Sequence, residues 1–211
     1  MTSPARGRLI ALEGIDGCGK STQARSLAGS LGAVSTHEPG ATELGRALRA
    51  LVLDPDRAGP VPRAEALLMA ADRAQHVEEI VLPALAEGRW VVTDRFSGST
   101  LAYQGWGRGL ATDSLRKMVG WAAGGIEADL SVLVDVPVEV ARQRIGTSSP
   151  DRLERLDPDF HERVRHGFVA LARADPDHWA VVDGTAPPDE VAAAVRAEVA
   201  ARLGPVPGAV A

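Results

Sequence analysis

The chain has 211 residues, of which 45% are hydrophobic and 24% are charged, and its formal net charge is −5 at pH 7. This composition is typical of a folded globular protein that can bury a full core. The negative charge argues against a broad nucleic-acid-binding surface, and no apolar run has the length of a membrane span. The single cysteine, Cys18, excludes an internal disulfide. We therefore expect one cytoplasmic domain, residues 1–211, with neither nucleic acid nor membrane as a partner.

The glycine-rich stretch 14–22 matches the phosphate-binding loop pattern G-x-x-x-x-G-K-S. An apolar segment, 8–13, precedes it and predicts a buried strand, and apolar residues at helical spacing follow it in 21–31. Backbone N–H groups of such a loop can surround phosphate oxygens, Lys20 can reach the outer phosphates, and the hydroxyl of Ser21 can hold Mg²⁺. A plain glycine-rich turn is the alternative, but the strand–loop–helix context favours a nucleoside triphosphate site. The predicted triphosphate-binding residues are Gly14, Ile15, Asp16, Gly17, Cys18, Gly19, Lys20, Ser21 and Thr22.

The rest of the chain alternates between short apolar segments and amphipathic ones. Four further strands are predicted, at 34–37, 90–94, 130–135 and 179–183. One predicted helix begins after a Thr42 cap, and its inward face consists of Leu44, Leu48, Leu51 and Val52. Further helices are predicted at 63–85 (kinked at Pro83), 112–123, 137–145, 160–174 and 188–203. This alternation predicts an α/β fold of three layers around a five-stranded parallel sheet. Residues 204–211 are expected to form a flexible tail.

Asp94 ends an apolar strand, and Arg95 follows it directly. A carboxylate at the carboxyl end of such a strand matches the second nucleotide-site signature, in which it faces Mg²⁺. Because many strands end in Asp, this interpretation depends on the glycine-rich loop. Residues 96–110 contain many hydrogen-bonding and stacking groups, including Tyr103 and Gln104, so we interpret them as a ligand-binding loop rather than an ordinary surface loop.

At these residues the chain resembles the bacterial thymidylate kinases, from Leu9 to about Leu203. The most specific stretches are 13–22, Glu38-Pro39-Gly40, Asp94-Arg95-Phe96 and the Ser-Thr-Leu-Ala-Tyr-Gln-Gly of 99–105. The resemblance implies a P-loop kinase fold with a small mobile lid at about 144–157, and a homodimer. It also implies transfer of the ATP γ-phosphate to dTMP, with Mg²⁺, to give dTDP.

The resemblance further implies roles for single residues. The implied acceptor site consists of Asp16, Glu38, Arg49, Met69, Arg73, Arg95, Thr100, Tyr103 and Gln104. Within it, Arg49 and Arg95 hold the acceptor phosphate, Arg73 contacts the thymine edge, and the ring of Tyr103 disfavours a 2′-hydroxyl. The implied catalytic residues are Lys20, Asp94, Arg95, Arg144 and Arg152, and the implied metal ligands are Ser21 and Asp94.

The chain departs from the family pattern at three places. Met69 stands where a phenylalanine usually stacks on thymine, and His37 stands where an arginine is common. The lid carries Thr147-Ser148-Ser149-Pro150 in place of closely spaced arginines, which leaves Arg144 and Arg152. Two alternatives therefore stay open: a kinase for a modified deoxyuridylate or another pyrimidine monophosphate, and a switch protein that hydrolyses ATP slowly.

Overall fold

A computed structural model of the chain describes residues 6–146 and 150–204. Within these residues five parallel strands form one sheet in the order β2-β3-β1-β4-β5. The strands are β1 (Leu9–Glu13), β2 (Val34–His37), β3 (Val91–Asp94), β4 (Leu130–Asp135) and β5 (Trp179–Asp183). The predicted strands and their parallel arrangement are confirmed. Residues 147–149 of the expected lid and 205–211 of the expected tail lie outside the described residues.

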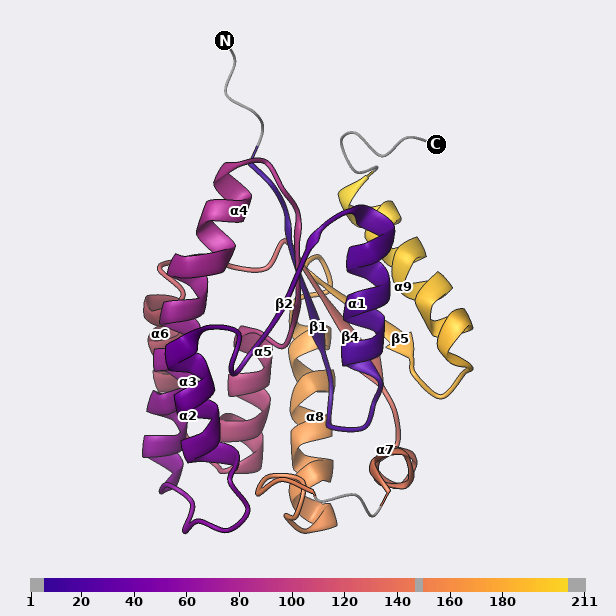
Figure 1. Ribbon diagram of the computed structural model, residues 1–211. Coiled ribbons are helices and arrows are strands. Elements are labelled where there is room, and N and C mark those ends of the chain that lie inside the picture. Colours follow the sequence, from indigo (N-terminus) through magenta and orange to yellow (C-terminus); the bar gives the residue numbers. More distant parts are fainter. Residues whose placement is uncertain (1–5, 147–149, 205–211) are drawn as a thin grey trace.

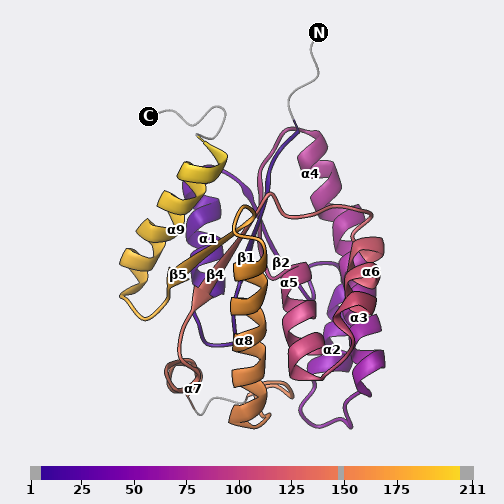
Figure 2. The same ribbon diagram turned by 180° about the vertical axis from the view of Figure 1, so that it is seen from behind.

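Helices cover both faces of this sheet, which gives the predicted three layers (Figures 1 and 2). One face is covered by α1 (Lys20–Leu31) and α9 (Pro188–Leu203), which pack against each other. The helices on the other side are α3 (Pro62–His76), α4 (Leu82–Ala86), α5 (Ser97–Thr100), α6 (Thr112–Ala122) and α8 (Pro158–Ala174). Two more helices, α2 (Glu43–Leu53) and α7 (Val138–Ile145), pack on α3 and α8 respectively.

Strand β1 lies at the centre of the sheet and is buried along its whole length. Ile10 and Leu12 pack in the same cluster as Leu27 of α1, whereas Leu9 and Ala11 pack with residues such as Val81 on the other side. Successive side chains of a strand point to opposite faces, so a central parallel strand needs apolar residues at every position. The continuous apolar run that precedes the glycine-rich loop follows from this position.

The predicted inward face of α2 was wrong for two of its four residues. Thr42 caps the helix as expected, because its Oγ1 accepts a hydrogen bond of 2.9 Å from the Gly45 N–H. Leu44 and Leu51, however, are 48% and 45% exposed, and the buried positions are Gly45 and Val52. A Cβ at position 45 would lie 2.4 Å from Asp72 Oδ1, so the helix packs closely on α3 through its glycine.

Two predicted segments contain π-helical turns. The helix predicted over 63–85 is divided into α3, a π-helical turn η1 (Val77–Val81) and α4. In a regular α-helix the ring of Pro83 would clash with the carbonyl group of Glu79, which belongs to this π-helical turn. The disruption expected from Pro83 therefore lies one turn before the proline. Residues 96–110, predicted to be a loop, form α5 and a second π-helical turn, η2 (Leu101–Gly107), most of which is buried.

The carboxyl ends of the three strands on the β2 side of the sheet meet at one edge. Asp94 pairs with Leu12 of β1 and with His37 of β2, so the segments that follow these strands converge there. Ligands of parallel α/β sheets bind at this edge. None of the helices in the described part of the chain combines the length and the hydropathy needed to cross a membrane.

Candidate active site

The glycine-rich loop turns sharply between β1 and α1. A Cβ at Gly17 would lie 2.3 Å from the carbonyl oxygen of Ala141, and its φ of 81° is in the left-handed region, so both space and backbone require glycine. The loop brings Lys20 to the start of α1, where its Nζ lies 3.2 Å from Asp16 Oδ1 and 3.3 Å from the Ile15 carbonyl oxygen. A groove beside the loop is also lined by Arg144 and Gly184. A buried ammonium and a helix start at one groove are suited to a polyphosphate.

Ser21 and Asp94, the predicted metal ligands, meet in an adjoining cavity, which Lys20 also lines. The Ser21 hydroxyl donates a short hydrogen bond to Asp94 Oδ2. In the described part of the chain, Asp94 Oδ1 is one of two buried side-chain polar atoms that have no hydrogen-bond partner. A hydroxyl and a carboxylate with a free oxygen fit Mg²⁺, which prefers oxygen ligands and usually takes the rest from water and phosphate.

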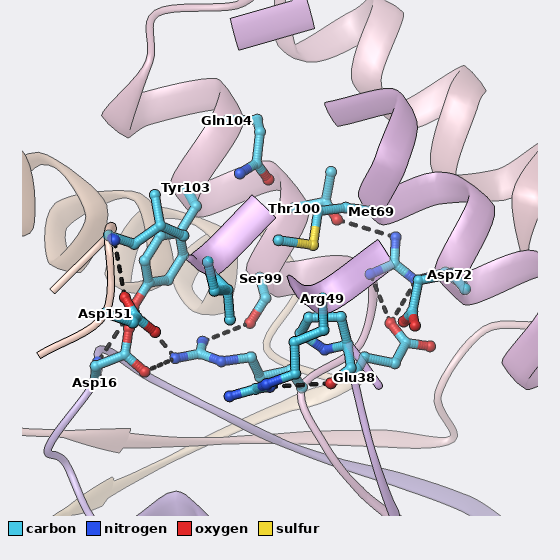
Figure 3. Close-up of a pocket in the computed structure, with 15 residues that line it drawn as sticks. Asp16, Glu38, Arg49, Met69, Asp72, Ser99, Thr100, Tyr103, Gln104 and Asp151 are labelled. Atoms are coloured by element: carbon cyan, nitrogen blue, oxygen red, sulfur yellow. Dashed lines mark hydrogen bonds and ion pairs between the residues drawn. The ribbon is translucent and has the colours of Figure 1, made fainter. Parts of the chain in front are cut away.

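A second pocket, which has a cavity volume of about 70 Å³ and opens to solvent, adjoins the loop (Figure 3). Its lining includes all nine residues predicted for the acceptor: Asp16, Glu38, Arg49, Met69, Arg73, Arg95, Thr100, Tyr103 and Gln104. Figure 3 shows Met69, Thr100 and Gln104 on one side, and Asp16, Arg49 and Glu38 along the other. We name this the acceptor pocket.

Asp16 links the loop to the acceptor pocket. Its carboxylate forms an ion pair with Arg95, and its Oδ2 accepts a hydrogen bond of 2.7 Å from the Tyr103 hydroxyl. Burial alone would raise the pKa of Asp16, but the charges of Arg95 and Lys20 lower it far below its usual range. Burial raises the pKa of Tyr103 well above its ordinary value, so this hydroxyl stays protonated and donates. The guanidinium of Arg95 lies 4.9 Å from the centre of the Tyr103 ring.

The backbone of Arg95 is left-handed, with a φ of 72°, and among the described residues other than glycine it alone has a positive φ. Such a conformation costs energy and is often found at functional sites. The side chain is held by hydrogen bonds of 3.0 Å to the Gly14 carbonyl oxygen and 2.9 Å to Ser99 Oγ. The turn therefore directs the guanidinium back over the loop.

Glu13 stabilises this turn by hydrogen bonds, and this role was not predicted from the sequence. Its buried carboxylate accepts hydrogen bonds from the N–H groups of Phe96 (3.0 Å) and Ser99 (3.2 Å) and from the Ser99 hydroxyl (2.6 Å). Burial raises the pKa of Glu13 to about 7. A charged residue at the end of a central strand was a signal that could have identified it, because such a carboxylate needs buried donors.

Arg73 also lines the acceptor pocket, and it is only 2% exposed. It donates to Glu38 Oε2 (2.9 Å), to Thr100 Oγ1 (3.0 Å) and to the Phe96 carbonyl oxygen (2.9 Å). His76 Nδ1 lies 2.8 Å from the other oxygen of Glu38. Without the family resemblance Arg73 would be read as an ordinary solvent-exposed helix charge, but the structure holds it rigidly with its partners.

Six further residues line the acceptor pocket without having been predicted to bind the acceptor: Pro39, Leu53, Asp72, Ser99, Asp151 and Leu153. Among them, Asp72 Oδ1 accepts a hydrogen bond of 2.9 Å from the Gly40 N–H. Burial, followed by the nearby carboxylate of Glu38, raises the pKa of Asp72 to about 6. An apolar helix that contains an adjacent Asp-Arg pair could have indicated a buried polar site, but not which cavity it faces.

The two predicted lid arginines lie in different places. Arg144 donates to the carbonyl oxygens of Gly184 (2.9 Å) and Cys18 (3.4 Å), beside the glycine-rich loop. Arg152 does not reach that loop in this structure. Its Nη2 contacts the buried carboxylate of Glu65 at 2.5 Å, and its Nε donates to the Val52 carbonyl oxygen at 2.6 Å. Of the two lid arginines, the structure therefore places Arg144, and not Arg152, in the lining of the groove beside the glycine-rich loop.

Comparison with known proteins identifies the family to which the chain is similar. The family model for thymidylate kinase matches residues 12–195. A thymidylate kinase of Desulfovibrio desulfuricans is 45% identical over 207 residues, which are 92% of this chain and 95% of the relative. That of Clavibacter michiganensis subsp. michiganensis is 48% identical over 205 residues, 93% of this chain and 96% of the relative.

A solved structure gives the same result for the fold. The crystal structure of thymidylate kinase from Ehrlichia chaffeensis superposes with a TM-score of 0.75 at 29% identity, and the match covers 92% of this chain and 99% of that one. Both sequence and fold therefore agree over nearly the whole length. The chain belongs to the thymidylate kinase family.

Proposed function

We propose that this chain transfers the γ-phosphate of ATP to dTMP and so gives dTDP and ADP. One observation carries the proposal: all the residues expected to bind the acceptor line one pocket, and this pocket shares Asp16, Arg49 and Asp151 with the groove beside the glycine-rich loop. Two phosphorylated ligands bound in these cavities would meet at the shared residues. Phosphoryl transfer mainly requires such alignment, together with stabilisation of charge.

The donor phosphates would be held by the backbone N–H groups of the loop and by Lys20. In the free protein the ammonium of Lys20 is balanced by Asp16, which is also paired with Arg95. A bound polyphosphate offers Lys20 a stronger anionic partner, so the ammonium can turn toward it while Arg95 still neutralises Asp16. The loop is thus prepared for the ligand without an uncompensated buried charge.

The acceptor would bind with its phosphate near Arg95 and Arg49 and its base near Met69, Thr100 and Gln104, as the two sides of the pocket in Figure 3 suggest. The Nη1 of Arg49 donates to the Pro39 carbonyl oxygen at 3.0 Å, which keeps this long side chain over the pocket. Arginine guanidinium groups suit phosphate oxygens because they can donate two parallel charge-assisted hydrogen bonds. This polarity of the pocket orients the acceptor phosphate toward the loop.

Mg²⁺ would be held by Ser21 and Asp94, which have the free oxygen and the hydroxyl that it requires. When bound, the ion supplies positive charge that stabilises the phosphate oxygens. Arg144 is the lid residue that we propose as a further cation for the transferred group, since it already lies beside the loop.

A comparison of acceptors tests this proposal. Rates with dTMP, dUMP, 5-hydroxymethyl-dUMP, dCMP and UMP, measured by coupled ADP release, should be highest for dTMP. A higher kcat/KM for a 5-substituted deoxyuridylate would instead support the altered-acceptor alternative, which Met69 motivates. ATP turnover that no nucleoside monophosphate increases would support the slow hydrolytic switch.

We further infer that two copies of the chain associate. Exposed leucines lie on the neighbouring helices α2 and α3, with Leu44, Leu51 and Leu67 being 48%, 45% and 61% exposed. An apolar surface of this kind is typical of a self-association interface. Light scattering coupled to size-exclusion chromatography should give the mass of a dimer, and Leu51→Arg should lower it to that of a monomer. A monomeric wild-type chain would contradict the inference.

A further inference from the structure

Glu65 of α3 is fully buried, yet it lies outside both the loop and the lining of the acceptor pocket. Its carboxylate accepts hydrogen bonds from two segments that are distant from it in sequence, one containing Gln104 and Arg108 and the other containing Arg152. Gln104 Nε2 lies 2.9 Å from Oε1, Arg108 Nη2 lies 2.9 Å from Oε2, and Arg152 Nη2 lies 2.5 Å from the same Oε2. Burial alone would raise the pKa of Glu65, but these hydrogen bonds lower it, so the carboxylate is ionised at neutral pH.

Arg152 fastens its segment of the chain at this carboxylate. The backbone N–H of Arg152 donates to the Leu53 carbonyl oxygen at 3.1 Å, and the guanidinium Nε donates to that of Val52. The neighbours of Arg152 in sequence, Asp151 and Leu153, line the acceptor pocket. Arg152 is held by Glu65 and by two carbonyl oxygens at the end of α2. The position of this part of the pocket wall therefore depends on the contacts of one arginine.

The same carboxylate also determines how Gln104 presents its amide. An ionised carboxylate only accepts hydrogen bonds, so Gln104 must turn its NH₂ group toward Glu65. The carbonyl oxygen of Gln104 then remains for a ligand, and it can accept from an N–H group. A pyrimidine with a protonated ring nitrogen meets this requirement, whereas a cytosine ring nitrogen in the same place is an acceptor and does not.

We propose that Glu65 is a positioning residue that fastens residues 150–157 against the acceptor pocket through Arg152 and at the same time orients the amide of Gln104. The identity of the acceptor in this proposal rests on the proposed function, but the fastening itself does not. Glu65 joins two walls of the pocket, so loss of the Glu65–Arg152 contact should weaken acceptor binding more than it slows the chemical step.

Two variants and one control test the proposal. Arg152→Gln removes the arginine and leaves Glu65 with Arg108 and Gln104, whereas Glu65→Gln removes the charge of the carboxylate. Arg155→Gln is the matched control, because Arg155 belongs to the same segment but is exposed and donates to the carbonyl oxygens of Pro150 and Pro55. Hydrogen–deuterium exchange of residues 150–157 in the free protein measures fastening, and steady-state kinetics separates KM for dTMP from kcat.

We expect Arg152→Gln to speed exchange in 150–157 by about tenfold and to raise KM for dTMP by about tenfold, as for the loss of one charge-assisted hydrogen bond. The kcat should stay within about threefold of wild type, and Arg155→Gln should change neither the exchange rate nor the kinetic constants. The double variant Glu65→Gln/Arg152→Gln should be no worse than Glu65→Gln alone, because both changes remove the same contact. Glu65→Gln should also lower the preference for dUMP over dCMP, since a neutral amide no longer fixes Gln104.

If residues 150–157 of the Arg152→Gln protein exchanged hydrogen at the wild-type rate, the fastening role would be overturned. Equal changes of exchange and of KM in Arg155→Gln would overturn it too. A large loss of kcat with an unchanged KM would overturn it as well and would make Arg152 a catalytic cation. If Glu65→Gln does not fold, Arg152→Gln alone still provides both measurements. A wild-type chain that does not phosphorylate dTMP, but in which Arg152→Gln still speeds exchange, would refute the proposed function and support the fastening.

Discussion

The Tyr103 hydroxyl lies 2.7 Å from the carboxylate of Asp16, 87 residues away in the sequence, and this contact joins the acceptor pocket to the glycine-rich loop. Because the hydroxyl is occupied by Asp16 and Arg95, the position of the tyrosine ring in the pocket is fixed. A fixed ring excludes ligand atoms more effectively than a mobile one.

Tyr103→Ala should therefore admit ribose acceptors. The expected result is a lower ratio of kcat/KM for dUMP to that for UMP, since removal of the ring opens space for the 2′-hydroxyl. Tyr103→Phe is the control, because it keeps the ring and loses only the hydrogen bonds, so its ratio should stay near that of wild type. An unchanged ratio in the alanine variant would mean that Tyr103 does not read the sugar.

Arg144→Ala should lower kcat by about 10³-fold or more and raise KM for dTMP much less. The reason is that an arginine beside the developing charge acts mainly in the transition state, and related phosphoryl transfers lose 10³ to 10⁵ in rate without theirs. Steady-state assays at saturating ATP measure this. Arg142→Ala, an exposed change on the same helix, should be nearly neutral. Similar values for both variants would indicate that Arg144 is only a surface charge.

Met69→Phe should lower KM for dTMP by about fivefold, because an aromatic face on the base adds on the order of 1 kcal/mol. Met118→Phe, on α6 and outside the lining of the acceptor pocket, is the control for a general effect on packing. A KM for dTMP that stays constant or rises would favour an acceptor with a larger 5-substituent, which methionine accommodates by its flexibility.

Glu13 should make the stability of the protein depend on pH. Its pKa is raised from an ordinary value of 4.5 to about 7 by burial, so between these values the native chain binds more protons at this residue than the unfolded chain. The stability that Glu13 contributes is therefore complete below pH 4.5 and is lost as the pH rises through about 7.

Denaturant titrations of wild type and Glu13→Gln from pH 4.5 to pH 8 measure this effect. The free energy of unfolding of wild type, relative to that of Glu13→Gln, should fall by about 3 kcal/mol over this range. Titration of Asp72 and other groups occurs in both proteins and cancels in the difference. A difference that does not vary with pH would refute the raised pKa.

The sequence predicts most of the fold because its strands and helices have clear apolar patterns. It fails where tertiary contacts determine the outcome. The inward face of α2 follows the glycine at position 45 and not the leucines, since close packing on Asp72 depends on a missing side chain. Residues 96–110 do not repeat apolar residues at helical spacing. The start of their helix depends on the buried carboxylate of Glu13, which belongs to β1.

The parts of the candidate site that consist of neighbouring residues in the sequence could be predicted, and the contacts between distant residues could not. The glycine-rich loop is contiguous, and the acceptor residues were assigned through the family resemblance. By contrast, the pairing of Glu65 with Arg152 spans 87 residues, and no spacing rule indicates it. The family resemblance implies a place for Arg152 at the polyphosphate, whereas the structure gives it a buried partner in the protein.

The left-handed backbone of Arg95 sets backbone strain against side-chain contacts at one position. Glycine would adopt this conformation without cost, whereas an L side chain adds roughly 1–2 kcal/mol. The ion pair with Asp16 and the hydrogen bonds to Gly14 and Ser99 more than offset this cost, because removal of one partner of a buried ion pair costs about 3–5 kcal/mol. Position 95 is accordingly unsuitable for thermostabilisation by glycine, since the substitution that relieves the backbone also leaves Asp16 without its partner.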